Sequence, residues 1–203
     1  MSRGLYIALE GVEGVGKSTV AAALKELIEE AGHEVMTVRE PGGTATGERI
    51  RHVLLNTDDK VSPWTEALLF AAARSQLATE VVESALAAGT WVISDRSVYS
   101  SLAYQGGGRG LGVAEVRAVN EPGLGGTWPD VVALLRLDVG EGLARQEDPD
   151  RIGAAGRDFL EVVAETFEQL AQAEPDRVAV IDASLPVADV ARAIWKVAVD
   201  RSE

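Results

Sequence analysis

The segment GVEGVGKS, residues 11–18, has residue types and a spacing that bind phosphate groups. Gly11 is followed, after four intervening residues, by Gly16, Lys17 and Ser18, which is the P-loop pattern Gly-x-x-x-x-Gly-Lys-Ser. In such a loop the backbone N–H groups surround the β-phosphate, and the N-terminus of the following helix adds partial positive charge. Lys17 would neutralise oxygens of the β- and γ-phosphates, and Ser18 would bind Mg²⁺. The segment therefore predicts a nucleoside triphosphate site.

Glu13 places a carboxylate inside this loop, although the expected ligand is itself an anion. Backbone N–H groups hold the phosphates in such loops, so the side chain at position 13 can point elsewhere. Two orientations remain open, one toward solvent and one toward a second substrate. Because glutamate side chains are usually exposed, the solvent-facing orientation is the ordinary alternative to a role at the site.

A second pair of chemically useful residues follows the apolar run Trp91–Ser94. Asp95 ends this predicted strand, where a carboxylate would hold Mg²⁺, usually through water. Arg96 comes next, at the edge of the sheet where open α/β folds bind their ligands. An ordinary ion pair at the end of a strand is the alternative. The chain has no Asn-Lys-x-Asp motif, and no Asp-x-x-Gly motif follows this third predicted strand, although G proteins would show both.

Apolar runs that predict strands alternate with helical patterns along the whole chain, which is typical of an α/β fold with a parallel sheet. The predicted strands are Leu5–Leu9, Glu34–Val38, Trp91–Ser94, Val131–Leu137 and Val178–Ile181. One helical pattern runs from Lys17 to the stop at Gly32, and another from Ser62-Pro63 to Gly89. The glycine-dense segment 105–112 is expected to be a functional loop. We expect one domain over residues 1–203.

The composition restricts the possible partners. The chain has 19 basic and 32 acidic residues, a net charge of −13, which repels nucleic-acid polymers and anionic membranes. An anionic ligand would therefore need a local group of arginines. The absence of cysteine excludes thiolate chemistry and is compatible with a cytoplasmic protein. No apolar run is long enough to cross a membrane, and the N-terminus lacks the features of a signal peptide.

Several segments spread over most of the chain resemble those of one enzyme family. They are GVEGVGKST, REPGGTATGERIR, LFAAARSQ, SDRSVYSSLAYQGGGRG, WPDVVALLRLDV, DRIG and IDASLP. The chain is similar to the bacterial thymidylate kinases, and REPGGT and AYQGGGRG are the most specific of these segments. The resemblance implies transfer of the γ-phosphoryl group of ATP to the 5′-phosphate of dTMP, giving dTDP and ADP. It also implies a Mg²⁺ requirement, a homodimer, and the five-stranded parallel sheet of the nucleoside monophosphate kinases.

The resemblance also implies which residues bind dTMP. The set is Glu13, Arg39, Glu40, Pro41, Arg51, Phe70, Arg74, Arg96, Ser101, Tyr104 and Gln105. By their match to the family, Arg51 and Arg96 hold the acceptor phosphate and Phe70 stacks on thymine. Arg74 reaches the polar edge of the base, and Ser101 and Gln105 hydrogen-bond it. Tyr104 crowds the 2′ position and Glu13 faces the deoxyribose or the water shell of the metal. Arg39, Arg51, Arg74 and Arg96 would form the cationic group that the net charge requires.

The ATP site and the catalytic residues are implied in the same way. The expected ATP-binding residues are Gly11, Glu13, Gly14, Gly16, Lys17, Ser18, Thr19, Arg145, Asp182, Ala183 and Ser184. The expected catalytic residues are Lys17, Asp95, Arg96 and Arg151, with Ser18 and Asp95 as the Mg²⁺ ligands. A lid is expected at about residues 144–158. Glycine at position 14 resembles the bacterial type, in which the lid supplies the transition-state arginine. Arg145, Arg151 and Arg157 are the candidates, and Arg151 has the best local match.

Two departures from the family leave other functions open. The lid segment is shortened and acidic, which allows a nucleotide-binding protein with weak catalysis. Ser97 and Tyr99 replace residue types common in the family, which allows a kinase for another nucleotide or for a deoxynucleoside. A nucleoside acceptor would need a carboxylate base for its hydroxyl, and Glu40 is placed to serve. A phosphate acceptor is already ionised and needs none.

Overall fold

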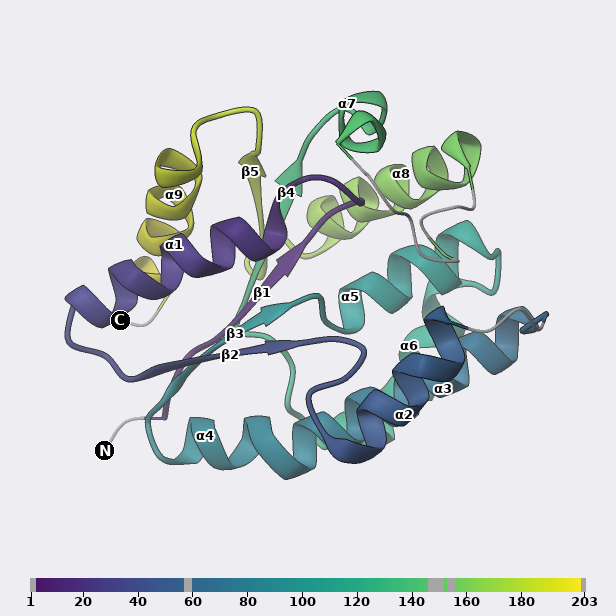
Figure 1. Ribbon diagram of the computed structural model, residues 1–203, viewed down its shortest axis with the longest axis horizontal. Coiled ribbons are helices and arrows are strands. Elements are labelled where there is room, and N and C mark those ends of the chain that lie inside the picture. Colours follow the sequence, from purple (N-terminus) through teal and green to yellow (C-terminus); the bar gives the residue numbers. More distant parts are fainter. Residues whose placement is uncertain (1–2, 57–59, 146–151, 153–155, 202–203) are drawn as a thin grey trace.

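The computed structural model describes residues 3–56, 60–145, 152 and 156–201. All five strands form one parallel sheet in the order β2-β3-β1-β4-β5 (Figure 1). Their bounds are Tyr6–Glu10 (β1), Val35–Arg39 (β2), Trp91–Asp95 (β3), Val131–Arg136 (β4) and Val178–Asp182 (β5). The predicted α/β class and the strand positions are confirmed.

Helices lie on both faces of this sheet. Their bounds are Lys17–Glu30 (α1), Ala45–Leu55 (α2), Pro63–Leu77 (α3), Glu83–Ala87 (α4), Val98–Ser101 (α5), Val113–Leu124 (α6), Val139–Ala144 (α7), Arg157–Ala173 (α8) and Val187–Asp200 (α9). Helices α1 and α9 pack against each other on one face, while α4 and α8 contact the sheet from the other (Figure 1). No helix in the described part of the chain combines the length and apolar character needed to span a membrane.

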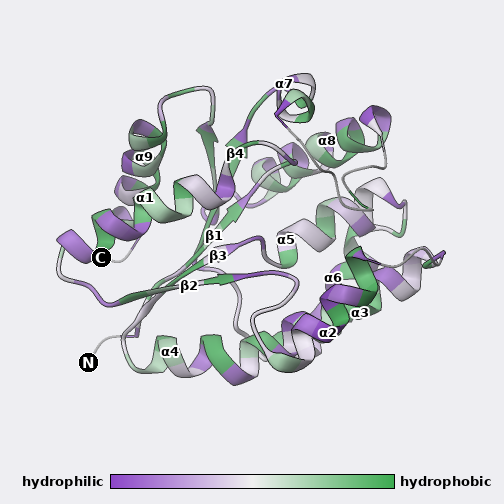
Figure 2. Cartoon of the chain, viewed as in Figure 1, coloured by the Kyte–Doolittle hydropathy of each residue, from purple (hydrophilic) through white to green (hydrophobic). Residues whose placement is uncertain are grey.

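The central strands form the core. Every residue of β1 is buried, and β4 is buried up to its last residue, Arg136. Apart from Glu10 and Arg136 at their ends, both strands are apolar on both faces, as expected for a parallel sheet covered on two sides (Figure 2). The edge strand β2 is partly exposed. The sheet therefore provides a rigid platform whose carboxyl edge carries the polar residues described below.

The structure corrects three sequence predictions. Strand β1 continues to Glu10, because parallel pairing with β4 extends to Glu10 opposite Leu134. The helix predicted up to Gly89 is interrupted by a wider π-helical turn, η1 (Ala78–Val82), between α3 and α4. The first half of the glycine-dense segment is a π-helical turn, η2 (Leu102–Gly108), and not a loop.

Helix α8 explains the third correction. A Cβ built on Gly107 would overlap the Thr166 side chain, and one on Gly108 would lie 2.5 Å from the ring of Phe159. Both contacts are with α8, so the glycines allow this helix to approach the η2 backbone closely. Only residues 109–112 form the loop that the glycine content predicted for the whole segment.

Candidate active site

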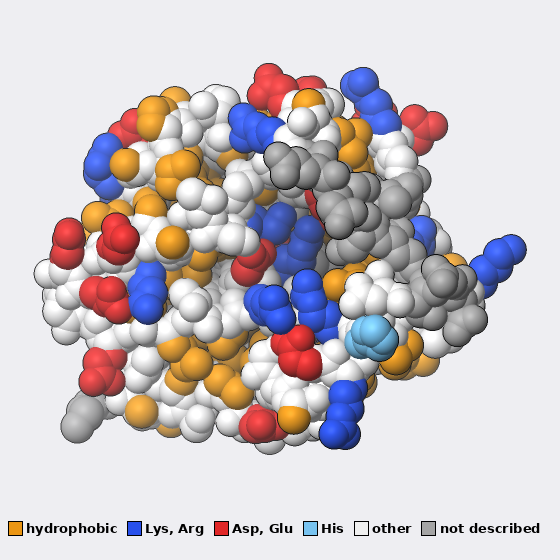
Figure 3. All heavy atoms as spheres, in the orientation of Figure 1, with side chains coloured by type: hydrophobic (Ala, Val, Ile, Leu, Met, Phe, Trp, Pro, Cys, Tyr) orange, Lys and Arg blue, Asp and Glu red, His pale blue; other side chains and the backbone are white. Residues whose placement is uncertain are grey.

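One cavity of about 460 Å³ opens at the carboxyl edge of the sheet. The phosphate loop lines one side of it and residues from β2, α3 and the α5–η2 segment line the other. Lysine and arginine side chains gather in this hollow (Figure 3). They include the four predicted arginines, Arg39, Arg51, Arg74 and Arg96. Although the net charge is −13, the chain therefore assembles a local cationic site.

The phosphate loop lies between β1 and α1, as its motif predicts. Gly16 precedes α1 in a left-handed conformation, with φ 88°. Lys17 is 8 % exposed, and its Nζ donates to the carbonyl oxygens of Gly11 (3.0 Å) and Val12 (2.9 Å). Burial and the nearby charge of Arg96 lower the pKa of Lys17 to about 8. The ammonium group is thus held against the loop at the wall of the cavity.

Ser18 and Asp95 meet beside the loop. Ser18 Oγ donates to Asp95 Oδ2 over 2.7 Å, and both residues line the cavity. The pairing of β1 with β3 sets Asp95 opposite Leu9, one residue before the end of β1. Hydroxyl and carboxylate oxygens suit Mg²⁺, which is commonly held by one or two protein oxygens together with phosphates and water. These two residues therefore fit a Mg²⁺ site; the described residues contain no cluster of three or more His, Asp or Glu ligands.

Glu13 points into the cavity. Its Oε1 accepts a hydrogen bond from Arg96 Nη2 (3.0 Å), and its Oε2 accepts one from the Tyr104 hydroxyl (2.8 Å). The Arg96 guanidinium also lies over the Tyr104 ring, 5.1 Å from its centroid. The side chain of Glu13 is 13 % exposed, so the solvent-facing alternative is wrong. The carboxylate joins the phosphate loop to the opposite wall.

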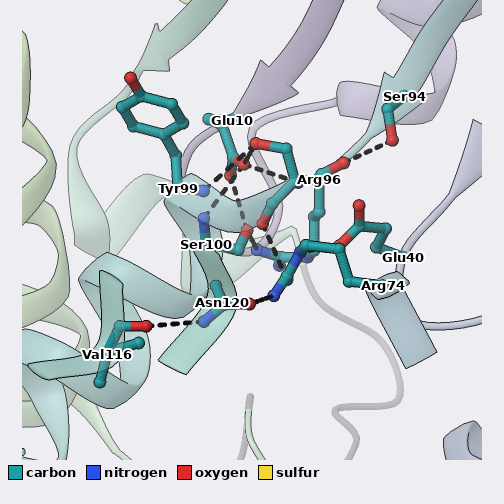
Figure 4. A network of polar contacts seen from close by, with 10 residues as sticks. Glu10, Glu40, Arg74, Ser94, Arg96, Tyr99, Ser100, Val116 and Asn120 are labelled. Carbon is teal, nitrogen blue, oxygen red and sulfur yellow. Dashed lines mark hydrogen bonds and ion pairs between the residues drawn. The ribbon is translucent and has the colours of Figure 1, made fainter. Parts of the chain in front are cut away.

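A buried carboxylate that the sequence reading did not single out holds Arg96 in place. Glu10, at the end of β1, is fully buried. Its Oε1 accepts from the Ser97 amide and hydroxyl, both at 2.7 Å, and its Oε2 accepts from Ser100 Oγ at 2.6 Å. Ser100 Oγ in turn accepts from Arg96 Nη1 at 3.2 Å (Figure 4). The only sequence signal for this role was a glutamate directly before the loop.

Beside this network the backbone of Arg96 has an unusual conformation, and the network itself accounts for one departure from the family. Arg96 has φ 74°, in the left-handed region that non-glycine residues rarely adopt. Its backbone is held by bonds from Arg96 N to Leu9 O (3.0 Å) and from Ser94 Oγ to Arg96 O (2.5 Å). Burial raises the pKa of Glu10, and the serine hydrogen bonds oppose that rise. Ser97 is thus a partner of Glu10, and its hydroxyl helps to stabilise the turn.

Arg74 is fixed on three sides at the deep end of the cavity (Figure 4). Its Nε donates to Glu40 Oε2 (2.7 Å), its Nη1 to Asn120 Oδ1 (2.5 Å) and its Nη2 to the Ser97 carbonyl (3.1 Å). Burial raises the pKa of Glu40 to about 7, although the charge of Arg74 opposes this. The geometry makes Glu40 an anchor for Arg74.

Arg39 and Arg51 lie nearer the cavity mouth. Arg39 is exposed and pairs with Glu48, with an N–O distance of 3.2 Å. Arg51 Nη1 donates to the Pro41 carbonyl at 2.8 Å, and the Glu40-Pro41 peptide bond is cis. The remaining predicted dTMP residues, Phe70, Ser101, Tyr104 and Gln105, also line the cavity. The structure therefore brings the whole predicted acceptor set together.

Comparison with known proteins agrees with this geometry. The family model described as thymidylate kinase matches residues 9–194. The chain belongs to the thymidylate kinase family. It is 44 % identical to a thymidylate kinase of Deinococcus radiodurans over 99 % of both chains. It is 46 % identical to one of Desulforudis audaxviator, over 95 % of this chain and 89 % of that one. It is 42 % identical to one of Bacillus pumilus, over 97 % and 96 %.

Several of the residues predicted to bind ATP do not line the cavity. Asp182, Ala183 and Ser184 follow the end of β5, where Asp182 Oδ1 accepts from the Ser184 amide (2.9 Å) and hydroxyl (2.6 Å). Arg145 directly follows α7. Arg151 lies outside the described residues. Ile152, which belongs to the segment expected to form the lid, lines the cavity.

The phosphate loop packs directly on α7, the helix that leads into the expected lid. A Cβ on Gly14, which has φ 75°, would overlap the carbonyl oxygen of Gly142. A Cβ on Gly142 would lie 2.6 Å from the carbonyl oxygen of Glu13. Glycine at position 14 led to the prediction that the lid supplies the transition-state arginine. The structure adds that position 14 has no space for a side chain.

Gly142→Ala tests this contact. The new methyl group would push α7 away from the loop, so we expect kcat/KM for ATP to fall by about tenfold or more. Gly140→Ala is the matched control on the same helix, because its Cβ would meet only the ends of the Asp138 and Arg157 side chains. Steady-state kinetics and thermal unfolding of both variants make the comparison. Equal behaviour of the two variants would contradict a specific loop–helix contact.

Proposed function

We propose that the chain transfers the γ-phosphoryl group of ATP to the 5′-phosphate of dTMP, forming ADP and dTDP. One observation carries this proposal: the phosphate loop and the arginine group line the same cavity. A donor triphosphate on the loop and an acceptor monophosphate on the arginines would then meet inside it. The relatives that carry the name thymidylate kinase support the same reaction.

The cavity suits phosphoryl transfer between two anions. The acceptor phosphate is already ionised, so the reaction depends on positioning and on neutralising charge rather than on a general base. Lys17 belongs to the loop side, and Arg39 and Arg51 to the acceptor side. Arg96 bridges the two sides through its bond to Glu13. We assign Arg96 to the acceptor phosphate, where its fixed guanidinium would limit the movement of the reacting group.

Ser18 and Asp95 would hold the Mg²⁺ ion that such kinases use. Their oxygen atoms lie beside the loop and meet the chemical requirement for the ion. When bound, the ion would neutralise part of the negative charge of the phosphates. Lys17 supplies a second positive group, and its position is fixed by two loop carbonyls.

The opposite wall would bind the deoxyribose and the base. The Tyr104 hydroxyl and Glu13 are hydrogen-bonded to each other, so neither side chain is free to move aside for a 2′-hydroxyl. Phe70 offers a flat apolar surface for the base, and Arg74 offers hydrogen-bond donors. The acidic residue in the phosphate loop thus belongs to the acceptor side.

The assembly and location are also proposals. Val53 of α2 and Trp64 and Leu68 of α3 are large apolar side chains that are 42–53 % exposed, which supports a homodimer through these helices. We assign the protein to the cytoplasm, where ATP and dTMP are found. One domain over 1–203, with a lid near 144–158, agrees with a family match over 9–194 and with one large core.

An acceptor panel tests the function. A coupled ADP-release assay with dTMP, dUMP, dCMP, dGMP, UMP and thymidine should give the highest kcat/KM with dTMP. Turnover that is highest with thymidine would overturn the monophosphate assignment. No turnover with any acceptor would favour a nucleotide-binding protein.

One observation favours a nucleoside kinase as the second candidate. The pKa of Glu40 is raised to about 7, a value that suits a general base near neutral pH. The bond from Arg74 Nε to the Glu40 carboxylate argues for an anchoring role instead. Thymidine is included in the panel to separate these two roles.

A further inference from the structure

We propose that Glu66 orients the side-chain amide of Gln105, so that the cavity selects a base with an N–H group at the position of N3 in thymine. The inference rests on the proposed function and names a residue that sets its base specificity. Glu66 belongs to α3 and is not among the residues that line the cavity. It would act through Gln105 and is a positioning residue.

The contact between the two side chains fixes the orientation of the amide. Glu66 is 1 % exposed, and its Oε1 accepts a hydrogen bond from Gln105 Nε2 over 3.0 Å. Arg109 donates to both carboxylate oxygens of Glu66, from Nε at 3.1 Å and from Nη2 at 3.3 Å. Both oxygens of Glu66 thus act as acceptors, toward three N–H donors in all. Gln105 must therefore present its NH₂ group to Glu66, and its carbonyl oxygen lies on the other side of the amide.

A neighbouring unpaired oxygen indicates that a ligand atom belongs at this place. Gln105 is 2 % exposed and lines the cavity, as does Ser101, which precedes it by one helical turn. Ser101 Oγ is buried and has no hydrogen-bond partner within the described part of the chain. Buried polar atoms are nearly always paired in folded proteins, so an exception in a binding cavity points to a ligand.

The three polar groups on this wall differ in what they can recognise. The Ser101 hydroxyl can donate or accept and so does not discriminate between bases, whereas Arg74 can only donate. Gln105, held by Glu66, offers an acceptor. A donor beside an acceptor matches the O4 and N3–H groups of thymine and uracil. Cytosine presents an amino group and an unprotonated N3 at the same places, and both would be mismatched.

The glutamate could instead serve only the packing of this region. Arg109 stacks on Phe159 of α8, with its guanidinium 4.6 Å from the ring centroid, and Glu66 holds Arg109 there. A purely structural role would change stability or the activity toward all acceptors alike. An orienting role changes the ratio between acceptors.

The first test compares Glu66→Gln with the wild type on dTMP and dCMP. Glutamine has nearly the same shape and can either donate or accept, so the Gln105 amide would be free to turn over. We expect the ratio of kcat/KM for dTMP to that for dCMP to fall by about tenfold or more. Arg109→Lys is the control, because it weakens the ion pair but keeps the bond between Glu66 and Gln105. It should leave the ratio unchanged, and thermal unfolding should show that both variants fold.

A double-mutant cycle separates an orienting role from a structural one. Gln105→Leu removes the amide, so Glu66→Gln should not change the acceptor ratio further in that background. Equal effects of Glu66→Gln with and without Gln105 would overturn the inference, as would an unchanged ratio in the single variant. A wild type that prefers dCMP or does not use dTMP would overturn the proposed function and this inference together. A wild type that prefers dTMP, with an unaltered ratio in Glu66→Gln, would overturn the inference alone.

Discussion

Replacing Lys17 with alanine is expected to lower kcat by about 10³-fold or more while the chain remains folded. The ammonium group is held at the cavity wall by the carbonyls of Gly11 and Val12, where it would neutralise the charge that moves between donor and acceptor. Removing a mostly buried charge relieves its desolvation, so we expect little loss of thermal stability. Steady-state kinetics and thermal unfolding measure the two effects.

Lys25→Ala is the matched control for this variant. Lys25 belongs to the same helix, α1, and forms an exposed ion pair with Glu29 at 3.6 Å. Exposed pairs of this kind contribute little to stability, so neither activity nor unfolding should change measurably. If Lys17→Ala retained full activity while Lys25→Ala did the same, the assignment of the phosphate loop would be refuted.

Replacing Arg151 with alanine is expected to lower kcat by about 10³-fold, the range of a transition-state arginine. The KM values for both substrates should change much less, because the group would act mainly on the transition state. Arg151 lies outside the described residues, so this prediction rests on its match to the family. The structure restricts the alternative sources of this arginine, at position 157 and in the phosphate loop.

The ion pair of Arg157 and the lack of space at Gly14 both bear on this test. Arg157 is exposed and forms an ion pair with Glu161 at 2.7 Å, so Arg157→Ala should have a small effect on kcat. The phosphate loop cannot supply the arginine instead, because a side chain on Gly14 would overlap the Gly142 carbonyl. Gly14→Arg should therefore not restore activity to Arg151→Ala. A loss below about tenfold in Arg151→Ala would move the role to Arg145 or Arg157.

The sequence by itself determined the features that depend only on residues close together in the chain. The phosphate loop was predictable because its spacing, the strand before it and the helix after it all lie between Tyr6 and Glu30. The five strands were predictable because each is a short apolar run, and the start of α3 because Ser62 precedes Pro63. The arginine group followed from family segments together with the charge balance.

The features that only the tertiary structure decided depend on partners far apart in the chain. Hydropathy could not predict that Gly107 and Gly108 are helical and lie directly against α8, because α8 comes from a distant part of the chain. The orientation of Glu13 depends on Arg96 and Tyr104, which the folded sheet brings to it from other segments. Composition alone treats such a glutamate as a solvated charge.

The same reason applies to the two carboxylates that position the site. Glu10 was visible only as a glutamate directly before the phosphate loop, and its hydrogen bonds to Ser97 and Ser100 require β1 and β3 to be neighbours. Nothing in the local sequence singles out Glu66, and its bond to Gln105 requires α3 to lie beside η2. Local sequence determined which groups could do chemistry. Packing decided which of them face one another, because hydrogen bonds form between neighbours in space and not along the chain.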